Sequence, residues 1–358
     1  MGVFEAIGTE THEEVLFGAD RESGLRTIIA IHDTSLGPAL GGTRFYPYRD
    51  EDAALRDVLR LAKGMTLKSA AAGLNLGGGK AVILGDPATL WSEALIRAYG
   101  RAIDSLGGRY VTAEDVGTTV EDMVLISKET PWVSGLPLDD GGSGDPSPAT
   151  ARGVMAALRA VGERLWDSDD LAGRRVAVQG VGKVGMDLVR RLTEVGAETI
   201  VTDTNASAVA TAVETYGSKA VSLDEIYDIE CDVFAPCALG AILNEETIPR
   251  LRCSAIAGCA NNQLAIDRNI DLIVDRGILY APDFVVNAGG VINIAAETDG
   301  YSIDRAATMV DRIYNNLNAV FETADTEGVD PQAAAMQFAK RRIDEAGGRR
   351  FRRRLEGT

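Results

Sequence analysis

Residues Arg175 to Gly185 read RVAVQGVGKVG, a short apolar strand followed at once by glycines with the spacing GxGxxG. In such a turn, Gly180 permits the tight bend, Gly182 lets backbone amides approach a pyrophosphate, and Gly185 allows the next helix to pack closely. The N-terminus of that helix favours the phosphate charge. The stretch predicts a dinucleotide-binding α/β unit, with candidate contacts at Gly180, Val181, Gly182, Lys183, Val184 and Gly185.

A second predicted strand, residues 199–202, ends at Asp203, which lies 23 residues after Gly180. An acidic side chain at this position hydrogen-bonds the adenosine ribose hydroxyls and repels a 2′-phosphate. We therefore predict that the cofactor is NAD rather than NADP. The alternatives are FAD binding and a plain glycine turn that caps an ordinary helix.

Apolar runs at 232–235, 255–258 and 278–280 alternate with helical or turn segments farther along the chain. This alternation predicts a parallel, doubly wound sheet of the Rossmann type. A helical pattern at 303–324 follows, and the arginine-rich tail at 349–354 is expected to be solvated or to contact another subunit.

The N-terminal part of the chain predicts a second, mixed α/β domain. Residues 24–31 are rich in β-branched and apolar side chains, which is typical of a strand, and residues 50–63 have the spacing of an amphipathic helix. Glycine and proline punctuate residues 136–148, so neither helix nor strand is expected there. We predict two α/β domains, residues 1–140 and 141–329, with a cleft between them.

The composition excludes several classes of function. A formal charge of −17 disfavours nucleic-acid binding, which depends on lysine and arginine, and the chain shows neither a secretion signal nor an apolar membrane span. We therefore predict a cytoplasmic protein without nucleic-acid or membrane partners. The four cysteines lack the spacing of a zinc site or a disulfide framework, so we expect buried thiols and no metal.

Two lysines and one aspartate lie in settings that suit chemistry. Lys68 stands in the apolar run GMTLKSAAA, Lys80 follows three glycines, and Asp115 lies in the polar segment TAEDVGTT after an apparent strand. Poorly hydrated lysine loses its proton more easily than exposed lysine, so the pattern indicates a lysine–carboxylate acid/base site. The plain alternatives are a snorkelling surface lysine and a helix-capping aspartate.

At these residues the sequence strongly resembles the glutamate/leucine/phenylalanine/valine dehydrogenase family. The resemblance covers nearly the whole chain and rests on long, widely spread segments: IHD (31–33), LGPALGGTR (36–44), AAGLNLGGGK (71–80), TAEDVGTT (112–119), DPSP (145–148), ANNQL (260–264) and VNAGGVIN (286–293). It implies reversible, NAD-dependent oxidative deamination of a branched-chain L-amino acid, leucine above isoleucine and valine, to a 2-oxo acid and ammonia. Alternatives are a phenylalanine or valine dehydrogenase and a catalytically silent NAD-binding regulator.

The resemblance also implies roles for single residues. Lys68 would bind the substrate carboxylate, Lys80 would activate the attacking water, and Asp115 would relay protons. A desolvated Lys80 beside cationic Lys68 should have a lowered pKa. Further expected substrate contacts are Gly41, Gly42, Leu40, Ala113, Val291, Ile294 and Asn262, and further expected cofactor contacts are Ser147, Thr150, Cys237, Ala238 and Asn262.

The resemblance has two implications for assembly. The C-terminal helices, at about residues 330–358, would pack on the first domain and complete a substrate-binding and oligomerisation domain. The chain would form a homo-oligomer, with an octamer as the expected number.

Overall fold

The structure is a computed structural model that describes residues 3–7, 11–298, 300–347 and 351, and its chain divides into two compact units. The first unit comprises Met1–Asp145, Ile294–Ser302 and Ala339–Thr358, and the second comprises Pro146–Asn293 and Ile303–Phe338. The first unit therefore combines segments that are far apart in the sequence. Most of the arginine-rich tail at 349–354 lies outside the described residues, which include only Phe351 from it.

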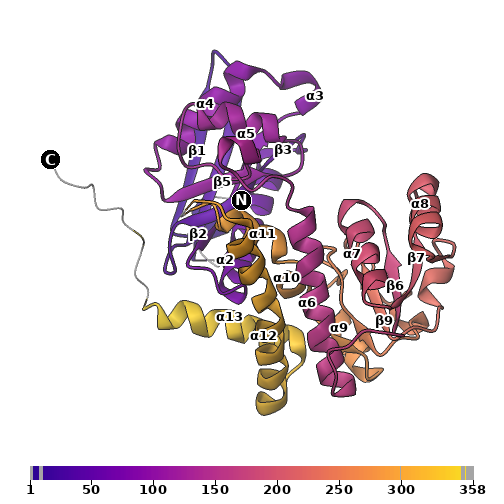
Figure 1. Ribbon diagram of the computed structural model, residues 1–358. Helices are drawn as coiled ribbons and strands as arrows, with labels where there is room; N and C mark the ends of the chain where they lie inside the picture. The colour runs from indigo at the N-terminus through magenta and orange to yellow at the C-terminus, as the bar shows by residue number, and fades with distance from the viewer. Residues whose placement is uncertain (1–2, 8–10, 299, 348–350, 352–358) are drawn as a thin grey trace. The chain divides into compact units, whose positions relative to one another are not determined.

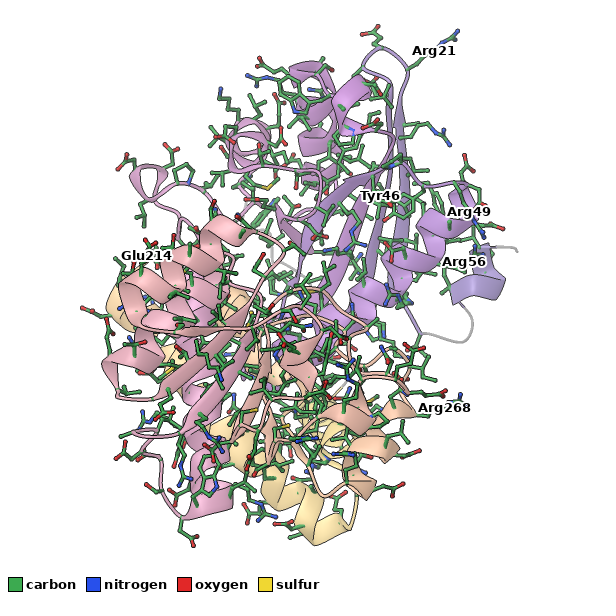
Figure 2. All side chains as sticks on the ribbon, turned by 90° about the vertical axis from the view of Figure 1, so that its right-hand side faces the viewer. Arg21, Tyr46, Arg49, Arg56, Glu214 and Arg268 are labelled. Carbon is green, nitrogen blue, oxygen red and sulfur yellow. The ribbon has the colours of Figure 1, made fainter. Side chains whose placement is uncertain are left out.

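The first unit is built on a five-stranded mixed sheet with the strand order β1-β2-β4-β3-β5. β1 and β2 are antiparallel, as are β2 and β4, whereas β3 runs parallel to both β4 and β5. The strands are β1 (Glu14–Asp20), β2 (Leu25–Asp33), β3 (Ala39–Tyr46), β4 (Gly77–Leu84) and β5 (Tyr110–Glu114). Figure 2 shows Arg21 projecting from the turn between β1 and β2.

Helices cover both faces of this sheet because its strands alternate their buried side chains. Ile28 and Ala30 pack in one apolar cluster with α2, and Ile29 and Ile31 pack in another with α4 and α5. The described helices of this unit are α1 (Val3–Ile7), α2 (Glu51–Ala71), α3 (Pro87–Leu90), α4 (Glu93–Asp104) and α5 (Val120–Ser127).

α2 is longer than its amphipathic pattern predicts, because it continues past residue 63 to Ala71. Thr66, Ser69 and Ala70 are buried in the added turns, where the helix packs on β4. Burial of these small side chains offsets the cost of Gly64, roughly 0.5–1 kcal/mol within a helix. At the polar start of α2, Arg56 is exposed and projects from the ribbon (Figure 2).

The second unit contains a six-stranded sheet with the strand order β11-β10-β9-β6-β7-β8, and every pairing in it is parallel. The first strand, β6, lies in the middle, and the chain then proceeds first to one side and later to the other. This is the doubly wound order that the sequence predicts, and ligands bind where the strand order reverses. The strands are β6 (Arg175–Gln179), β7 (Glu198–Thr202), β8 (Lys219–Ala220), β9 (Val233–Pro236), β10 (Ala255–Ile256) and β11 (Leu279–Tyr280).

Helices alternate with these strands, and Figure 1 shows α7 and α8 beside β6 and β7. The long helix α6 packs along α12 and also contacts α7. The helices are α6 (Ser147–Trp166), α7 (Lys183–Glu194), α8 (Ala206–Tyr216), α9 (Asn269–Asp275), α10 (Asp283–Val286), α11 (Gly289–Ala295), α12 (Ile303–Glu327) and α13 (Pro331–Glu345). The division between the units falls within α11 and again within α13.

The glycine- and proline-rich stretch at 136–148 is not wholly irregular, contrary to the sequence prediction. A short 3-10 turn forms at Leu138–Asp140, and α6 already begins at Ser147. Pro148 is compatible with that start because proline lacks only a backbone N–H that the first turn of a helix leaves unpaired.

Among the described helices, none is long and apolar enough to cross a membrane. Within the same residues, His, Cys, Asp and Glu side chains form no group of three or more that could hold a metal ion.

Candidate active site

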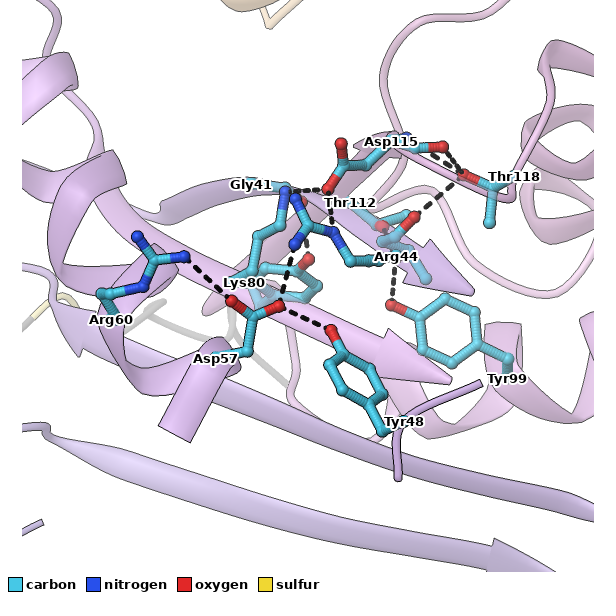
Figure 3. A network of polar contacts seen from close by, with 12 residues as sticks. Gly41, Arg44, Tyr48, Asp57, Arg60, Lys80, Tyr99, Thr112, Asp115 and Thr118 are labelled. Carbon is cyan, nitrogen blue, oxygen red and sulfur yellow. Dashed lines mark hydrogen bonds and ion pairs between the residues drawn. The ribbon is translucent and has the colours of Figure 1, made fainter. Parts of the chain in front are cut away.

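An ion pair between Lys80 and Asp115 forms the centre of the first unit's candidate site (Figure 3). Lys80 projects from β4, and Asp115 directly follows β5. Nζ of Lys80 lies 2.5 Å from Oδ2 of Asp115, although the two side chains are only 9% and 22% exposed. The structure therefore brings together the two residues that were predicted to perform proton transfer.

A tight turn fixes the position of Asp115. Its backbone N–H donates to the Thr118 hydroxyl over 3.0 Å, and the same hydroxyl donates to the Thr43 carbonyl over 2.9 Å. Gly117 adopts a φ of +81°, and a Cβ atom there would lie 1.9 Å from the Phe45 carbonyl oxygen. The turn thus requires glycine, and it ties the carboxylate to the neighbouring strand β3.

Arg44 extends the ion pair into a network that sequence reasoning did not identify. Its Nε atom lies 3.4 Å from Oδ2 of Asp115, the oxygen that Lys80 also contacts. Its Nη1 atom lies 2.8 Å from Oδ2 of Asp57 on α2, and the Tyr48 hydroxyl donates to that same oxygen over 2.6 Å. The guanidinium of Arg44 on β3 therefore contacts two carboxylates, Asp57 of α2 and Asp115 after β5 (Figure 3).

Burial and neighbouring charges act in opposite directions on this pair. Burial lowers the pKa of Lys80 below its ordinary value, and the positive charge of Arg44 acts in the same direction, while Asp115 partly opposes both. Burial raises the pKa of Asp115, but Lys80 and Arg44 outweigh it, so that pKa is lowered. The expected direction for Lys80 agrees with the structure, and Arg44 is a like charge that the sequence prediction did not include.

The glycines around Lys80 are required for packing of the chain itself. A Cβ atom at Gly78 would lie 2.0 Å from the Thr66 backbone nitrogen, so glycine there lets α2 approach β4. A Cβ at Gly41 would lie 1.8 Å from the Gly79 carbonyl oxygen, and one at Gly42 would lie 2.9 Å from Cβ of Asp115. Close approach of β3 to both neighbouring strands thus explains two glycines that were predicted to contact substrate.

Lys68 lies in the last turn of α2 and is half-buried. The end of this helix is held by Arg342 of α13, whose Nη1 donates to the Leu74 carbonyl over 2.6 Å and to the Ala70 carbonyl over 3.2 Å. A second nitrogen of Arg342 donates to the Asn75 side chain over 3.0 Å. The C-terminal segment of the chain therefore braces the helix that carries Lys68.

The other candidates of the first unit are apolar. Leu40 on β3 and Ala113 on β5 are buried, and Ile294 is half-buried. Ala113 pairs with Gly42 across the strands and lies two residues before Asp115, so the strand that leads to the carboxylate adds an apolar surface. Such a surface suits an aliphatic substrate side chain better than a charged one.

The glycine loop of the second unit has the features of a dinucleotide site. Gly180 adopts a φ of +100°, and a Cβ at Gly185 would lie 2.0 Å from the Gly180 carbonyl oxygen. A Cβ at Gly182 would meet no described atom within 4 Å, so space remains at the start of α7. Oδ2 of Asp203 accepts the Val181 N–H over 2.7 Å, which places the carboxylate beside the loop. These residues fit a dinucleotide whose pyrophosphate lies at the α7 N-terminus.

The remaining second-unit candidates flank this loop or α6. Cys237 follows β9, and its N–H donates to the Gln179 carbonyl over 2.7 Å, while Ala238 is exposed next to it. Asn262 has a φ of +51°, a conformation that asparagine tolerates and that is enriched at functional sites. Ser147 and Thr150 occupy the first turn of α6, Lys183 and Val184 begin α7, and Val291 is buried in α11.

The network around Arg44 illustrates which residues sequence reasoning missed. Asp57 lies between the buried positions Leu55 and Val58, so a carboxylate at the edge of the apolar face of α2 was a usable signal. Arg44 gave a weaker signal, since it alternates with buried residues on β3 as any half-exposed strand residue does. Its pairing with Asp57 depends on how α2 packs, which a linear pattern does not show.

Comparison with known families agrees with this architecture. A family profile described as the Glu/Leu/Phe/Val dehydrogenase dimerisation domain matches residues 12–132. A second profile, described as Glutamate/Leucine/Phenylalanine/Valine dehydrogenase, matches residues 141–212 and 201–350. Together the two profiles cover most of both units.

Individual relatives span nearly the whole chain. The leucine dehydrogenase of Geobacillus stearothermophilus is 54% identical over 344 residues, which cover 96% of this chain and 94% of the relative. The valine dehydrogenase of Streptomyces albus is 48% identical over 342 residues, covering 95% and 94%. The crystal structure of L-tryptophan dehydrogenase from Nostoc punctiforme superimposes with a TM-score of 0.87 at 44% identity, covering 96% of this chain and 99% of the other. With its Rossmann-type second unit, the chain belongs to the glutamate/leucine/phenylalanine/valine dehydrogenase family, the oxidoreductases that act on amino acids with a nicotinamide cofactor.

Proposed function

We propose that this protein catalyses the reversible, NAD-dependent oxidative deamination of branched-chain L-amino acids, with leucine preferred and isoleucine and valine also accepted. The observation that carries the proposal is the buried ion pair of Lys80 and Asp115 within a family of amino-acid dehydrogenases. Relatives named leucine and valine dehydrogenases, at 54% and 48% identity, support the branched-chain substrate class.

Each of the three charged residues has a separate role in the proposed mechanism. Lys68 binds the substrate α-carboxylate, and Asp115 accepts a proton from the α-amino group. Bound NAD supplies the hydride acceptor for the α-carbon. Lys80, which burial favours in its neutral form, then takes a proton from the water that attacks the iminium carbon. Collapse of that adduct, with protons returned through Asp115, releases ammonia and the 2-oxo acid.

The apolar candidate residues explain the proposed substrate class. Leu40, Ala113, Val291 and Ile294 would surround the substrate side chain, while Gly41, Gly42 and Asn262 would contact its polar end. A γ-carboxylate against such residues loses hydration without gaining a partner, which costs several kcal/mol, roughly 2–7 for a polar group. Glutamate is therefore rejected, whereas leucine, isoleucine and valine differ by only about 1–3 kcal/mol.

We also propose NAD rather than NADP as the cofactor. The Asp203 carboxylate lies at the glycine loop, where it accepts the Val181 N–H, and its charge would repel a 2′-phosphate. The second unit would bind the dinucleotide, and Ser147, Thr150, Cys237 and Ala238 would complete its contacts. The first unit would bind the amino acid and mediate assembly into a homo-oligomer, an octamer. Because NAD is an intracellular cofactor, we place the protein in the cytoplasm.

The test is a panel of leucine, isoleucine, valine, phenylalanine and glutamate with each dinucleotide, read as kcat/KM from NADH or NADPH absorbance. We expect the branched-chain substrates to fall within about 200-fold of one another with NAD. We expect at least about 100-fold lower values for glutamate. A larger kcat/KM for phenylalanine or glutamate, equal use of NADP, or the absence of turnover with every amino acid would contradict the proposal.

A further inference from the structure

The chain's four cysteines form two pairs in the register of two neighbouring strands. β9 and β10 are parallel, with Ala255 opposite Val233 and Ile256 opposite Phe234, an offset of 22 residues. The pairs Cys237 with Cys259 and Cys231 with Cys253 have the same offset. One pair follows the carboxyl ends of the two strands, and the other precedes their amino ends.

Beyond the two strands the pairing slips by one residue, yet the Cys237 and Cys259 side chains stay within hydrogen-bond distance of each other. The Ala257 N–H donates to the Phe234 carbonyl over 3.0 Å, and the Ala260 N–H donates to the Pro236 carbonyl over 2.9 Å. Paired strands lie about 4.7–4.9 Å apart, and disulfides join Cα atoms about 4.4–6.8 Å apart. Neither Cys237 nor Cys259 is a fully buried residue, contrary to the buried thiols expected from the sequence.

The two pairs differ in thiol chemistry. A hydrogen bond from Cys259 lowers the pKa of the Cys237 thiol, which favours the reactive thiolate. Burial raises the pKa of Cys231 and of Cys253 to about 12, so these thiols stay protonated at neutral pH. Cys231 and Cys253 therefore serve as an internal control, a pair with the same sequence offset whose thiols burial keeps protonated.

Cys237 also packs directly against the glycine loop. A Cβ at Gly180 would lie 2.9 Å from the Cys237 carbonyl carbon, and a Cβ at Gly185 would lie 3.5 Å from Cβ of Cys237. β9 lies between β6, which leads into that loop, and β10, which leads to Cys259. A bond that draws Cys237 towards β10 therefore acts on the loop's immediate neighbour, at the point where the strand order reverses.

We infer that Cys237 and Cys259 are a redox modification site at which a peroxide forms an intramolecular disulfide that weakens dinucleotide binding. The effect on binding rests on the proposed function, whereas formation of the disulfide does not. The Cys237 thiolate attacks one peroxide oxygen and releases hydroxide, which gives a sulfenic acid. The Cys259 sulfur then attacks that sulfur and displaces the hydroxyl group as water. In total, two thiols lose two electrons and two protons, and hydrogen peroxide becomes two molecules of water.

The experiment treats the full-length, reduced protein with hydrogen peroxide, maps its disulfides by peptide mass spectrometry and measures NADH binding by fluorescence titration. We expect a Cys237–Cys259 disulfide and an NADH affinity lowered by about 5- to 150-fold, the usual range of coupling between two sites. A dithiol reductant should restore the affinity. Cys259→Ser should bind NADH normally, and peroxide should no longer lower its NADH affinity. Cys253→Ser should still lose NADH affinity when it is treated with peroxide.

Three other outcomes of this experiment would each contradict a different claim. Oxidation that yields only sulfinic acid, or a disulfide that joins other cysteines, overturns the modification site. A Cys237–Cys259 disulfide with unchanged NADH affinity overturns the coupling to the glycine loop. Failure of the reduced protein to bind NADH refutes the proposed function instead, so the two failures are distinguishable.

Discussion

Lys80 directs its ammonium group at Asp115 over 2.5 Å within a site that leaves 9% of the lysine side chain exposed. Removing charge from water at such a site costs several kcal/mol per ion, which a single ion pair does not reliably repay. The pKa of Lys80 is accordingly lowered, and the pKa of Asp115 is lowered as well, because Lys80 and then Arg44 outweigh the effect of burial. This combination provides an amine that loses its proton readily beside a fixed acceptor.

Asp115→Asn should shift the pH dependence of the reaction towards acid. Asp115 raises the pKa of Lys80, so its neutral replacement lowers that pKa further. Because the proposed base acts when deprotonated, the acidic limb of kcat/KM should move to lower pH. The maximal rate should also fall, by about 10²–10⁴-fold if proton relay is lost. The pH dependence of Lys80 acylation, read by mass spectrometry, measures the shift of the Lys80 pKa independently of turnover. An acidic limb that keeps its position or moves to higher pH would contradict the assignment of Lys80 as the base.

Arg44→Gln should shift the same limb in the opposite direction. The positive charge of Arg44 lowers the pKa of Lys80, so its loss raises that pKa and moves the acidic limb to higher pH. Arg44 acts here as a positioning residue for Asp115, so kcat should fall more than KM rises. Arg49→Gln is the matched control, because Arg49 is exposed on the same unit (Figure 2). If the acidic limb of kcat/KM moved in the same direction in Asp115→Asn and Arg44→Gln, the opposite effects proposed for these two charges on the Lys80 pKa would be wrong.

Gly78→Ala should destabilise the first unit. The added Cβ would lie 2.0 Å from the Thr66 nitrogen, so α2 must move away from β4 at a cost of about 1–3 kcal/mol or more. Gly64→Ala is the control, since a Cβ there meets no described atom within 4 Å and alanine favours a helix by roughly 0.5–1 kcal/mol. Thermal unfolding should give a lowered midpoint for Gly78→Ala and an equal or raised one for Gly64→Ala. Equal midpoints for both variants would contradict the packing argument.

Arg342→Ala should loosen the end of α2. Burial lowers the pKa of Arg342, and its donors satisfy the Leu74 and Ala70 carbonyls. Loss of such bonds to a charged group costs about 1.5–3 kcal/mol. Because Lys68 lies in the last turn of α2, KM for leucine should rise more than kcat falls. Lys340→Ala, an exposed change on the same helix, is the control and should leave the unfolding midpoint and KM near those of the parent. If both variants changed the midpoint and KM equally, Arg342 would not brace the end of α2.

The second unit could be predicted from the sequence because its signals are local. The β6 strand, the glycine turn and the strand that ends before Asp203 lie within about 30 residues, and each has a fixed role in the turn. The alternation of strands and helices predicts a parallel, doubly wound sheet. The observed sheet confirms that part of the prediction.

The parts that sequence reasoning missed depend on contacts between distant segments. Arg44 meets Asp57 only because α2 packs on the sheet, and α2 itself continues through Gly64 only because its later turns are buried. The register of β9 against β10 could not be predicted from the sequence either, and the proximity of Cys237 to Cys259 depends on how these two strands align. Lys80 and Asp115 could be selected from their settings, but their contact required the structure.

The central claim is that Lys80 is the base, and NADH formation from leucine and NAD by Lys80→Ala tests it most directly. Lys128→Ala, an exposed lysine change on the same unit, is the control, and NADH binding shows that the second unit is intact. We predict that kcat of Lys80→Ala falls by about 10²–10⁴-fold while NADH binding and the activity of Lys128→Ala stay close to those of the parent. Turnover by Lys80→Ala at the parent rate would contradict the account.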